Sequence, residues 1–336
     1  MAKPTIICLT PVKNEAWILD NFLKSASLWA DHIIISDQMS TDGSREIAKK
    51  YPKVILIDNN QQKDFSEYGL RKPLIDEARK ISGKRLLISL DADEIFTPNF
   101  QSKEWIEMQN LPEGAIIKFP WINIYKNFEK FWDYSFSIPV GYMDDGAEFK
   151  SGLIHAARLF DPTKTTKVVY EASEIKILHL QYTDWERMKM KQRWYQCFEK
   201  INYSHKHSID IFRQYHHMEN LKNNDLKEVP DEWINIYRQN GIDLNHLSVN
   251  QNYHWELTIL NYFEEHGTKF FKELNIWDID WVKKAKFYQI KNPERFKDPR
   301  TIADKLIQIW LLKTQKNHNN RIVRKIDKLI KKFLSY

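Results

Sequence analysis

Residues 85–94 read RLLISLDADE, and this stretch decides the fold class. Its first six residues are a short apolar run of the kind that forms a strand buried on both faces, as in a parallel sheet. Three similar runs precede it, at residues 5–10, 32–36 and 53–58. Segments of helical character lie between these runs, at residues 16–29, 44–51 and 66–81. The alternation predicts an α/β fold with a mostly parallel, doubly wound sheet that is flanked by helices.

Polar and acidic residues follow three of the predicted strands. The groups are Thr10-Pro11-Val12-Lys13-Asn14-Glu15, then Asp37 with Ser40-Thr41-Asp42-Gly43-Ser44, and finally Asp91-Ala92-Asp93-Glu94. In open α/β sheets ligands bind beyond the carboxyl ends of the strands, so these groups are expected to share one cleft. Carboxylates in the pattern of Asp91 and Asp93 suit a hard divalent cation, although a solvated acidic turn has the same pattern. The sequence therefore predicts an electronegative cleft for a metal ion or a hydroxyl-rich ligand.

The rest of the chain is first mixed and then helical. Strands are predicted at residues 115–121 and 175–180, separated by an aromatic-rich stretch and by an acidic loop at residues 144–148. Beyond Asp184 the pattern is helical almost to the end. We therefore expect a catalytic domain over residues 1–220 and a helical extension over residues 221–336.

Composition excludes several classes of protein. The 336 residues include only 9 glycines, and the loop after the first predicted strand has none. This argues against a nicotinamide-dependent oxidoreductase, because no G-x-G-x-x-G occurs, and against a sugar-phosphate nucleotidyltransferase with a glycine-rich loop. The two cysteines exclude a disulfide scaffold and favour a reducing compartment. We expect a cytoplasmic protein, since neither a secretory signal nor an apolar run of about 18 residues occurs.

The net charge of +6 is unevenly distributed. From Lys283 onward there are 16 Lys and Arg residues against 4 Asp and Glu, whereas the first 282 residues carry 35 against 41. Residues 320–336 place apolar side chains at helical spacing with lysines and arginines between them. This pattern predicts an amphipathic helix that suits an anionic membrane surface, the alternative being a helix that packs on the body or on a second subunit. No recognised nucleic-acid-binding motif accompanies the basic residues, so no nucleic-acid partner is expected.

The strand-end motifs resemble those of glycosyltransferase family 2 enzymes with the GT-A fold, in particular bacterial enzymes that extend lipopolysaccharide cores or surface polysaccharides. A second block that fits the same family comprises Arg158-Leu159-Phe160, Val169-Tyr170-Glu171 and His179-Leu180-Gln181-Tyr182. The resemblance covers about residues 4–200. It departs from the family pattern at Gln38-Met39 and at Tyr170, where a histidine is usual.

The resemblance implies a metal-dependent, inverting transfer of a sugar from a nucleotide-sugar donor, with a UDP-sugar favoured and Mn²⁺ or Mg²⁺ as cofactor. The acceptor would be a hydroxyl of a glycan or of a lipid-linked molecule. Donor-binding residues implied by the family pattern are Thr10, Pro11, Asn14, Glu15, Asp37 and Asp91, and Asp37 would hydrogen-bond the nucleobase. By their charge alone, Arg71, Lys72 and Arg158 are candidates for extra contacts with the donor phosphates, the alternative for each being a solvated or packing cation.

The same resemblance implies the metal ligands and the base. Asp93 would ligate the metal, His179 would complete its site or touch the diphosphate, and Asp91 would reach the ribose or a metal-bound water. Glu171 would be the general base for the acceptor hydroxyl, with Asp145 and Glu148 of the acidic loop as second choices. One positioned base and one in-line displacement predict inversion at the anomeric carbon.

Two other interpretations remain open at the level of the sequence. A sugar-phosphate nucleotidyltransferase would share the sheet, and a non-catalytic glycan- or membrane-binding protein would share the fold without turnover. A membrane-bound form would be peripheral, on the inner face of the membrane.

Overall fold

The computed structural model describes residues 3–60, 66–126, 128–163, 168–244, 247, 252–334 and 336. Contacts within the chain divide it into two compact units. The first comprises Met1–Asp184 with Lys227–Val249, and the second comprises Trp185–Leu226 with Asn250–Tyr336. The functional division expected at residue 220 stays a prediction.

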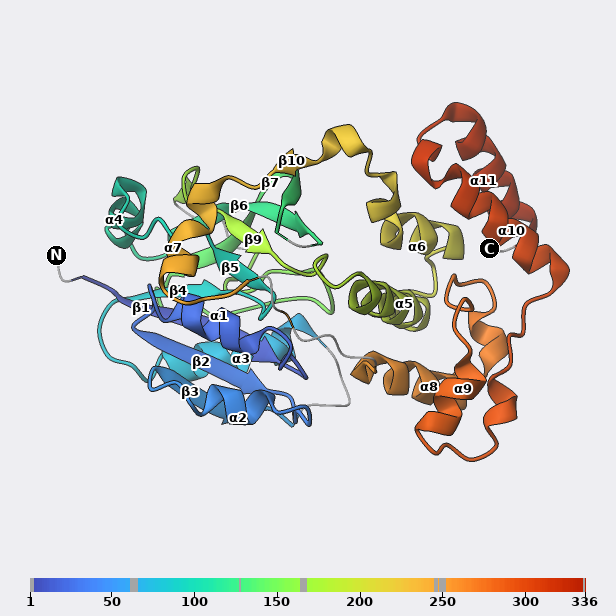
Figure 1. The fold of residues 1–336 in the computed structure, drawn as a ribbon, viewed down its shortest axis with the longest axis horizontal. Coiled ribbons are helices and arrows are strands. Elements are labelled where there is room, and N and C mark those ends of the chain that lie inside the picture. The colour runs from blue at the N-terminus through green and yellow to red at the C-terminus, as the bar shows by residue number, and fades with distance from the viewer. Residues whose placement is uncertain are drawn as a thin grey trace. The chain divides into compact units, whose positions relative to one another are not determined.

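The first unit is built on one sheet, to which the described residues contribute ten strands (Figure 1). Along the sheet the order is β3-β2-β1-β4-β7-β6-β9-β5, with β8 beside β6 and β10 beside β7. The strands are β1 (Thr5–Val12), β2 (His32–Asp37), β3 (Val54–Asp58), β4 (Arg85–Ser89), β5 (Glu94–Phe96), β6 (Ile116–Tyr125), β7 (Lys130–Met143), β8 (Val169–Glu171), β9 (Ile177–His179) and β10 (Lys227–Glu228). The helices of this unit are α1 (Leu19–Ala26), α2 (Ser44–Ala48), α3 (Glu67–Ala78), α4 (Lys103–Gln109) and α7 (Asn235–Gln239).

Strands β1 to β4 form the parallel part of the sheet, which confirms the fold class predicted from the sequence. Cys8 of β1 lies opposite Ile33 of β2 on one side and Ile88 of β4 on the other. All four apolar runs that predicted strands are strands, and the helices predicted between them are present as α1, α2 and α3.

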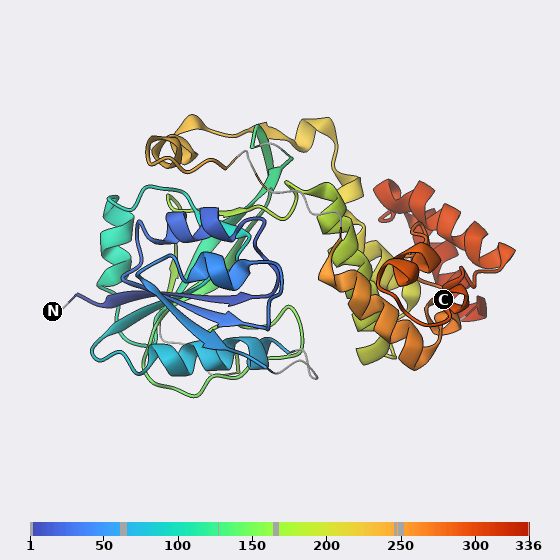
Figure 2. The same ribbon diagram turned by 60° about the horizontal axis from the view of Figure 1, so that its bottom comes forward.

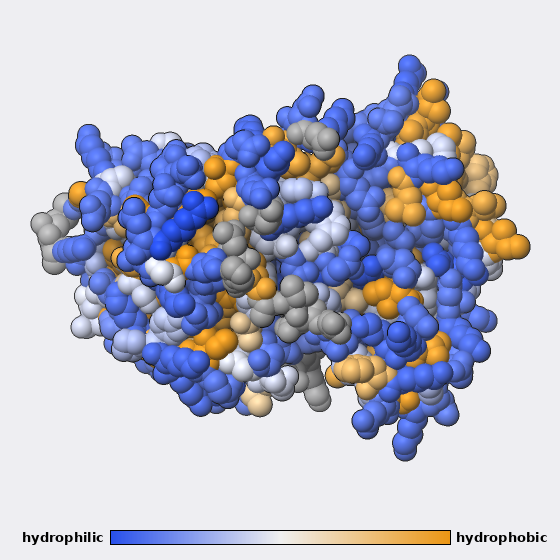
Figure 3. Space-filling view, in the orientation of Figure 1, coloured by the Kyte–Doolittle hydropathy of each residue, from blue (hydrophilic) through white to orange (hydrophobic). Residues whose placement is uncertain are grey.

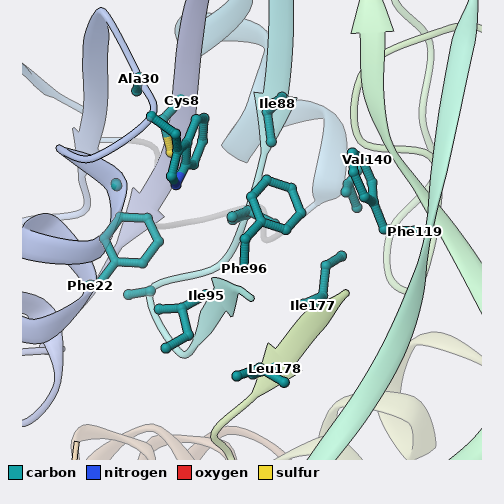
Figure 4. Close-up of a cluster of buried hydrophobic side chains, with 14 of the residues drawn as sticks. Cys8, Phe22, Ala30, Ile88, Ile95, Phe96, Phe119, Val140, Ile177 and Leu178 are labelled. Carbon is teal, nitrogen blue, oxygen red and sulfur yellow. The ribbon is translucent and has the colours of Figure 1, made fainter. Parts of the chain in front are cut away.

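Helices lie on both sides of this sheet (Figure 2), which is why its strands are apolar on both faces. Ile6 and Cys8 of β1 belong to the larger buried cluster, which includes Phe22 of α1 and Phe96 of β5 (Figure 4). Their neighbours in the strand, such as Ile7, point the other way, into a cluster that includes residues of α3. A strand buried on alternate sides has no polar face, and the sequence showed this as an unbroken apolar run.

Strand β7 was not predicted, because the sequence left residues 130–143 as an aromatic-rich stretch. It runs antiparallel to both β4 and β6, so the sheet is mixed beyond β4. The close approach of β6 and β7 requires a glycine in this strand. A Cβ on Gly141 would lie 2.9 Å from Cβ of Ile117, closer than side-chain packing tolerates.

The second unit is helical, which confirms the predicted C-terminal helical extension. Its α-helices in the described residues are α5 (Trp185–Asn202), α6 (Ser208–Tyr215), α8 (His254–His266), α9 (Trp281–Phe287), α10 (Ile302–Thr314) and α11 (Arg321–Leu334). Short 3₁₀ turns also occur, at His217–Asn220, Asn223–Asp225, Asp231–Trp233, Thr268–Phe271, Pro293–Phe296 and Gln315–Asn317, of which Asp231–Trp233 belongs to the first unit. Among the described helices of both units, none combines the length and the apolar character that crossing a membrane requires.

Candidate active site

The order of the strands brings the predicted site residues to one edge of the sheet. The chain adds β2 and β3 on one side of β1 and then places β4 on the other side. The carboxyl ends of β1 and β4 therefore diverge at a topological switch point, where open α/β sheets bind ligands. Asn14 follows β1, Asp37 ends β2, and Asp91 and Asp93 follow β4.

The loops after β1 and β2 are held together by hydrogen bonds between backbone and side chains. Asn14 has the left-handed φ of 55° that asparagine tolerates, and its backbone N–H donates to Oγ of Ser40 over 2.9 Å. Its side-chain Oδ1 in turn accepts from the backbone N–H of Thr41 at 2.8 Å. The next backbone N–H, of Glu15, donates to Oγ of Ser44 at 2.9 Å. Asn14 therefore fixes the two loops relative to each other.

Asp37 is a buried carboxylate in which one oxygen accepts hydrogen bonds and the other has no donor among the described residues. Its Oδ2 accepts from Nη1 of Arg45 at 2.6 Å and from the backbone N–H of Ser40 at 3.1 Å. Among the described residues nothing donates to its buried Oδ1. Leaving a buried acceptor without a donor costs about 1–3 kcal/mol. A ligand that presents an N–H there would recover that free energy.

Lys13 contributes positive charge near Asp37. Burial lowers the pKa of its ammonium group, and the charge of Asp37 opposes that shift.

Asp91 lies between two arginines that the sequence had named as phosphate candidates. Nη2 of Arg71, a buried residue of α3, donates to Oδ1 of Asp91 at 2.6 Å. Nη2 of Arg158 donates to Oδ2 of Asp91 at 3.1 Å. The same Arg158 binds both carboxylate oxygens of Glu94, at 2.6 and 3.0 Å. Arg71 also donates to Glu67 at 3.3 Å, so three carboxylates surround two guanidinium groups.

The protonation equilibria of this cluster reflect its burial. Burial raises the pKa of the Glu94 carboxyl, and the charge of Arg158 only partly offsets this effect. Burial alone would lower the pKa of Arg158, but the charges of Asp91 and Glu94 outweigh it and raise that pKa well above its usual range. Arg158 therefore remains a cation, and its charge favours the ionised form of the buried Glu94 carboxyl.

Asp93 and His179 meet where β5 pairs with β9. Glu94 lies opposite His179 in this antiparallel pair, and the backbone N–H of Leu180 donates to the carbonyl of Asp93 at 2.7 Å. Nε2 of His179 lies 4.0 Å from Oδ2 of Asp93. Nδ1 of His179 lies 2.9 Å from Oδ1 of Asn123. An imidazole that donates its Nδ1 proton to this oxygen would have Nε2 available as a metal ligand.

This donor pair fits a divalent cation. Two ligands at about 2.1 Å from one ion stand between about 3 Å (cis) and about 4 Å (trans) apart, and the 4.0 Å separation lies within that range. Among the described residues no group of three or more His, Cys, Asp or Glu side chains could hold a metal. The predicted set of Asp91, Asp93 and His179 is therefore not gathered as one metal cluster, and Asp91 lies with the arginines instead.

Glu171, the predicted general base, is not brought to this edge of the sheet. It lies in β8 opposite Lys118 of β6, and the two form an ion pair at 2.8 Å. His179 lies opposite Asn123 of the same strand, five residues further on, which is about 16 Å along a strand. In the described arrangement Glu171 is therefore separated from Asp93 and His179, and its role stays a prediction.

Asp145, one of the two second choices for the base, lies at the opposite end of β4. The residue before Asp145 follows β7, and its backbone N–H donates to the carbonyl of Arg85, the first residue of β4. Asp145 itself accepts from the hydroxyl of Tyr142 at 2.7 Å, and Glu148 is exposed. Asp91 follows the other end of β4, about 20 Å away along the strand. Asp145 is therefore not brought to the strand-end site, and the role of Glu148 stays a prediction.

The remaining predicted residues have ordinary structural settings. Thr10 is buried within β1, with its hydroxyl 3.7 Å from Sγ of Cys8. Pro11 lies opposite Ser36 of β2. Sequence reasoning assigned no role to Glu94, Asn123 or Arg45, because only the tertiary structure brings them beside the named residues.

Residues 7–157, somewhat less than half of the chain, match the family model described as glycosyl transferase family 2, the family that the strand-end motifs indicated. Arg158, Glu171 and His179 lie outside the matched residues, and their roles rest on geometry and on the sequence resemblance. No curated protein sequence matches the chain.

Several solved structures are similar to parts of the chain or to all of it. Glucosyl-3-phosphoglycerate synthase from Mycobacterium tuberculosis, in complex with Mn²⁺, UDP and glucosyl-3-phosphoglycerate, is 19% identical over 35% of this chain and 44% of that chain, with a TM-score of 0.28. Mannosyl-3-phosphoglycerate synthase from Rubrobacter xylanophilus is 15% identical over 37% and 42%, with a TM-score of 0.28. A mannosyltransferase from Pyrobaculum calidifontis, in complex with GDP-Man and Mn²⁺, is 10% identical over 97% and 83%, with a TM-score of 0.36. The chain spans less than half of the first two, and at these TM-scores the likenesses carry no further argument.

Proposed function

We propose that the protein transfers a sugar, with inversion, from a nucleotide-sugar donor to a hydroxyl of a glycan or lipid-linked acceptor. The donor is a UDP-sugar, and the reaction depends on Mn²⁺ or Mg²⁺. The observation that carries the proposal is the buried Oδ1 of Asp37, an acceptor with no donor among the described residues, at the sheet edge that Asp91 and Asp93 also reach. A ring N–H such as that of uracil supplies the missing donor.

Asp93 and His179 would hold the metal ion, with water and donor oxygens as its other ligands. When bound, the ion neutralises charge on the leaving diphosphate. Asn123 would orient the imidazole of His179 through its contact with Nδ1.

Asp91 would accept a hydrogen bond from the ribose, because Arg71 and Arg158 hold its carboxylate in one orientation. The positive charge of both guanidinium groups, which lie beside Asp91, would also attract the diphosphate. Carboxylates outnumber guanidinium groups at this site, so a negatively charged nucleotide sugar should bind better together with a divalent cation.

Glu171 is the general base that we propose from the sequence resemblance. General-base catalysis contributes about 10²–10⁴-fold. If Glu171 acts as the base, Glu171→Gln will lower turnover by such a factor, while Lys118→Gln, which removes its ion-pair partner, will leave most of it. A Glu171→Gln protein with more than a tenth of wild-type turnover removes this residue from the mechanism, and Asp145→Asn and Glu148→Gln are then the next variants.

The function is tested by thermal stabilisation with UDP-, GDP- and CDP-sugars, each with and without Mn²⁺. We expect stabilisation that requires both the nucleotide and the cation, and slow hydrolysis of the preferred sugar nucleotide without acceptor. Stabilisation by no nucleotide would overturn the proposal. Release of pyrophosphate from a nucleoside triphosphate and a sugar phosphate would identify a nucleotidyltransferase instead.

The cytoplasmic location expected from the sequence is likewise a proposal. Fractionation of cells that produce the full chain tests it, with a soluble cytoplasmic protein and an integral membrane protein as references.

A further inference from the structure

Helices α10 and α11 form the C-terminal part of the second unit and pack on each other and on α6. Nε1 of Trp310 in α10 donates to Oδ1 of Asp327 in α11 at 2.9 Å, and Arg213 of α6 forms an ion pair with the same carboxylate at 3.1 Å. Val323 of α11 is buried, and Ile330 packs against a cluster that includes Leu311 of α10. The inward face of α11 is therefore already occupied.

A second apolar face of the two helices points outward. On α11, Ile322, Leu329 and Phe333 are spaced i, i+7 and i+11, which places them within about 20° of one line along the helix. On α10, Ile302, Leu306 and Ile309 form a similar line. The six side chains are between 46% and 81% exposed, whereas soluble proteins rarely expose such a group together. Figure 3 shows apolar atoms gathered over this part of the second unit.

The charged residues around these apolar lines are almost all cationic. Residues 300–336 contain ten Lys and Arg and only two acidic residues, Asp304 and Asp327. Both acids are buried: Asp304 forms a capping box with Thr301 at the start of α10, and Asp327 binds Arg213. Lys325, Lys328 and Lys332 are exposed on α11, on the side of the apolar line away from the buried face. The fold thus turns its acids inward and leaves basic side chains beside exposed apolar ones.

We propose that this α10–α11 surface, formed by Ile302, Leu306, Ile309, Ile322, Leu329 and Phe333 with their basic neighbours, binds the surface of a bilayer that contains anionic lipid. Apolar side chains enter the boundary between headgroups and acyl chains, and lysines beside them remain at the level of the lipid phosphates. The charge decides in favour of lipid over a second copy of the chain, because two copies would bring their lysines together. The sequence pointed only to residues 320–336, whereas the structure adds α10.

The proposal is tested with the full-length protein and vesicles of phosphatidylcholine alone or with phosphatidylglycerol added. We expect flotation with the anionic vesicles only, weakened by salt because the attraction is partly electrostatic. Lys325→Gln/Lys328→Gln/Lys332→Gln should weaken partitioning by more than tenfold, since each lysine near an anionic surface contributes about fivefold. Ile322→Asn/Leu329→Asn/Phe333→Asn should abolish flotation at any salt concentration.

Matched controls keep the test independent of net charge and of folding. Lys49→Gln/Lys50→Gln/Lys103→Gln removes three exposed lysines of the first unit, and Ile106→Asn removes an exposed apolar side chain of α4. Both should bind vesicles as the wild type does, and thermal unfolding verifies that every variant folds. Sedimentation velocity without lipid should show the same monomer for all of them.

Equal flotation of the wild type and the Asn triple variant would overturn the proposal. So would a wild-type dimer that the Asn substitutions dissociate without any binding to vesicles, because the surface would then be an interface between copies. Vesicle binding requires no nucleotide, so its failure would leave the proposed transfer reaction untouched.

Discussion

Oδ2 of Asp93 lies 4.0 Å from Nε2 of His179, although the two residues are separated by 86 positions in the sequence. The pairing of β5 with β9 creates this contact, and Asn123 on β6 orients the imidazole. This carboxylate and this imidazole are the pair that we propose as ligands of one divalent cation.

The first prediction concerns this pair. Asp93→Asn and His179→Ala should each reduce the thermal stabilisation by Mn²⁺ plus nucleotide and raise the apparent Kd for Mn²⁺ by about tenfold or more, since each loses one ligand. Calorimetric titration with Mn²⁺ in the presence of UDP measures the effect. Asp76→Asn and His205→Ala, at exposed positions, are the matched controls and should leave it unchanged. Wild-type affinity in both site variants would contradict the assignment.

Asp37→Asn should weaken the binding of nucleoside diphosphates by about 10–100-fold, the effect of losing a hydrogen bond to a charged acceptor. The variant keeps the size of the side chain, but it replaces one carboxylate oxygen with a donor. Affinity for UDP is measured with Mn²⁺ held in excess. Asp42→Asn is a poor control, because that carboxylate caps the neighbouring loop. Asp58→Asn is better, since it removes the other ion-pair partner of Arg45 and should leave nucleotide affinity unchanged.

Arg158→Met should lower the free energy of unfolding by about 3–5 kcal/mol at neutral pH, because it leaves the buried Glu94 without its cation. The raised pKa of Glu94 sets the pH dependence. Protonated Glu94 carries no charge and needs no cation beside it. The stability that Arg158→Met loses should therefore become smaller as the pH falls through the pKa of Glu94 in the folded state. Urea unfolding across that range measures it.

The double variant Arg158→Met/Glu94→Gln serves as the internal control for that prediction, because it removes both charges. It should recover at least half of the lost stability. Lys72→Met, which breaks an exposed ion pair with Asp76, should cost less than about 1 kcal/mol. A double variant no more stable than Arg158→Met would show that the cation is not what Glu94 requires.

His216 should give the second unit a stability that falls in acid. It lines a cavity of about 240 Å³, and burial lowers its pKa to about 4. An unfolded histidine takes up its proton near pH 6.5, so between about 6.5 and 4 the unfolded state binds more protons than the folded state. The free energy of unfolding should therefore fall as the pH drops through this window, by about 3 kcal/mol in full. His216→Gln should make the slope shallower and His205→Gln should not, as measured by urea unfolding at several pH values.

The geometry of His216 explains why its neutral form is preferred. Its Nδ1 lies 2.9 Å from the carbonyl of Phe212 and donates to it, and its Nε2 lies 2.9 Å from Nδ2 of Asn275 and accepts from it. A second proton on Nε2 would face that amide donor. An unchanged slope in His216→Gln would show that other groups control acid unfolding.

The sequence by itself determined the parallel part of the sheet and the edge at which the site lies. Strands such as 32–37 are apolar on both faces because helices cover both, and this leaves an unbroken run that can be recognised without coordinates. The polar groups after these strands had to share one edge, because parallel strands end on the same side of a sheet.

Only the tertiary structure decided which of those residues touch. Arg158 donates to Asp91, although 67 positions separate them in the sequence. Strands β8 and β9 both pair with β6 but at different positions along it, which separates Glu171 from His179 although the two are close in sequence. The packing of α10 against α6, and the burial of Asp304 and Asp327, also depend on contacts between residues far apart in the sequence. Periodicity and composition describe which faces a segment can bury, whereas the partner of each face depends on contacts between residues far apart in the chain.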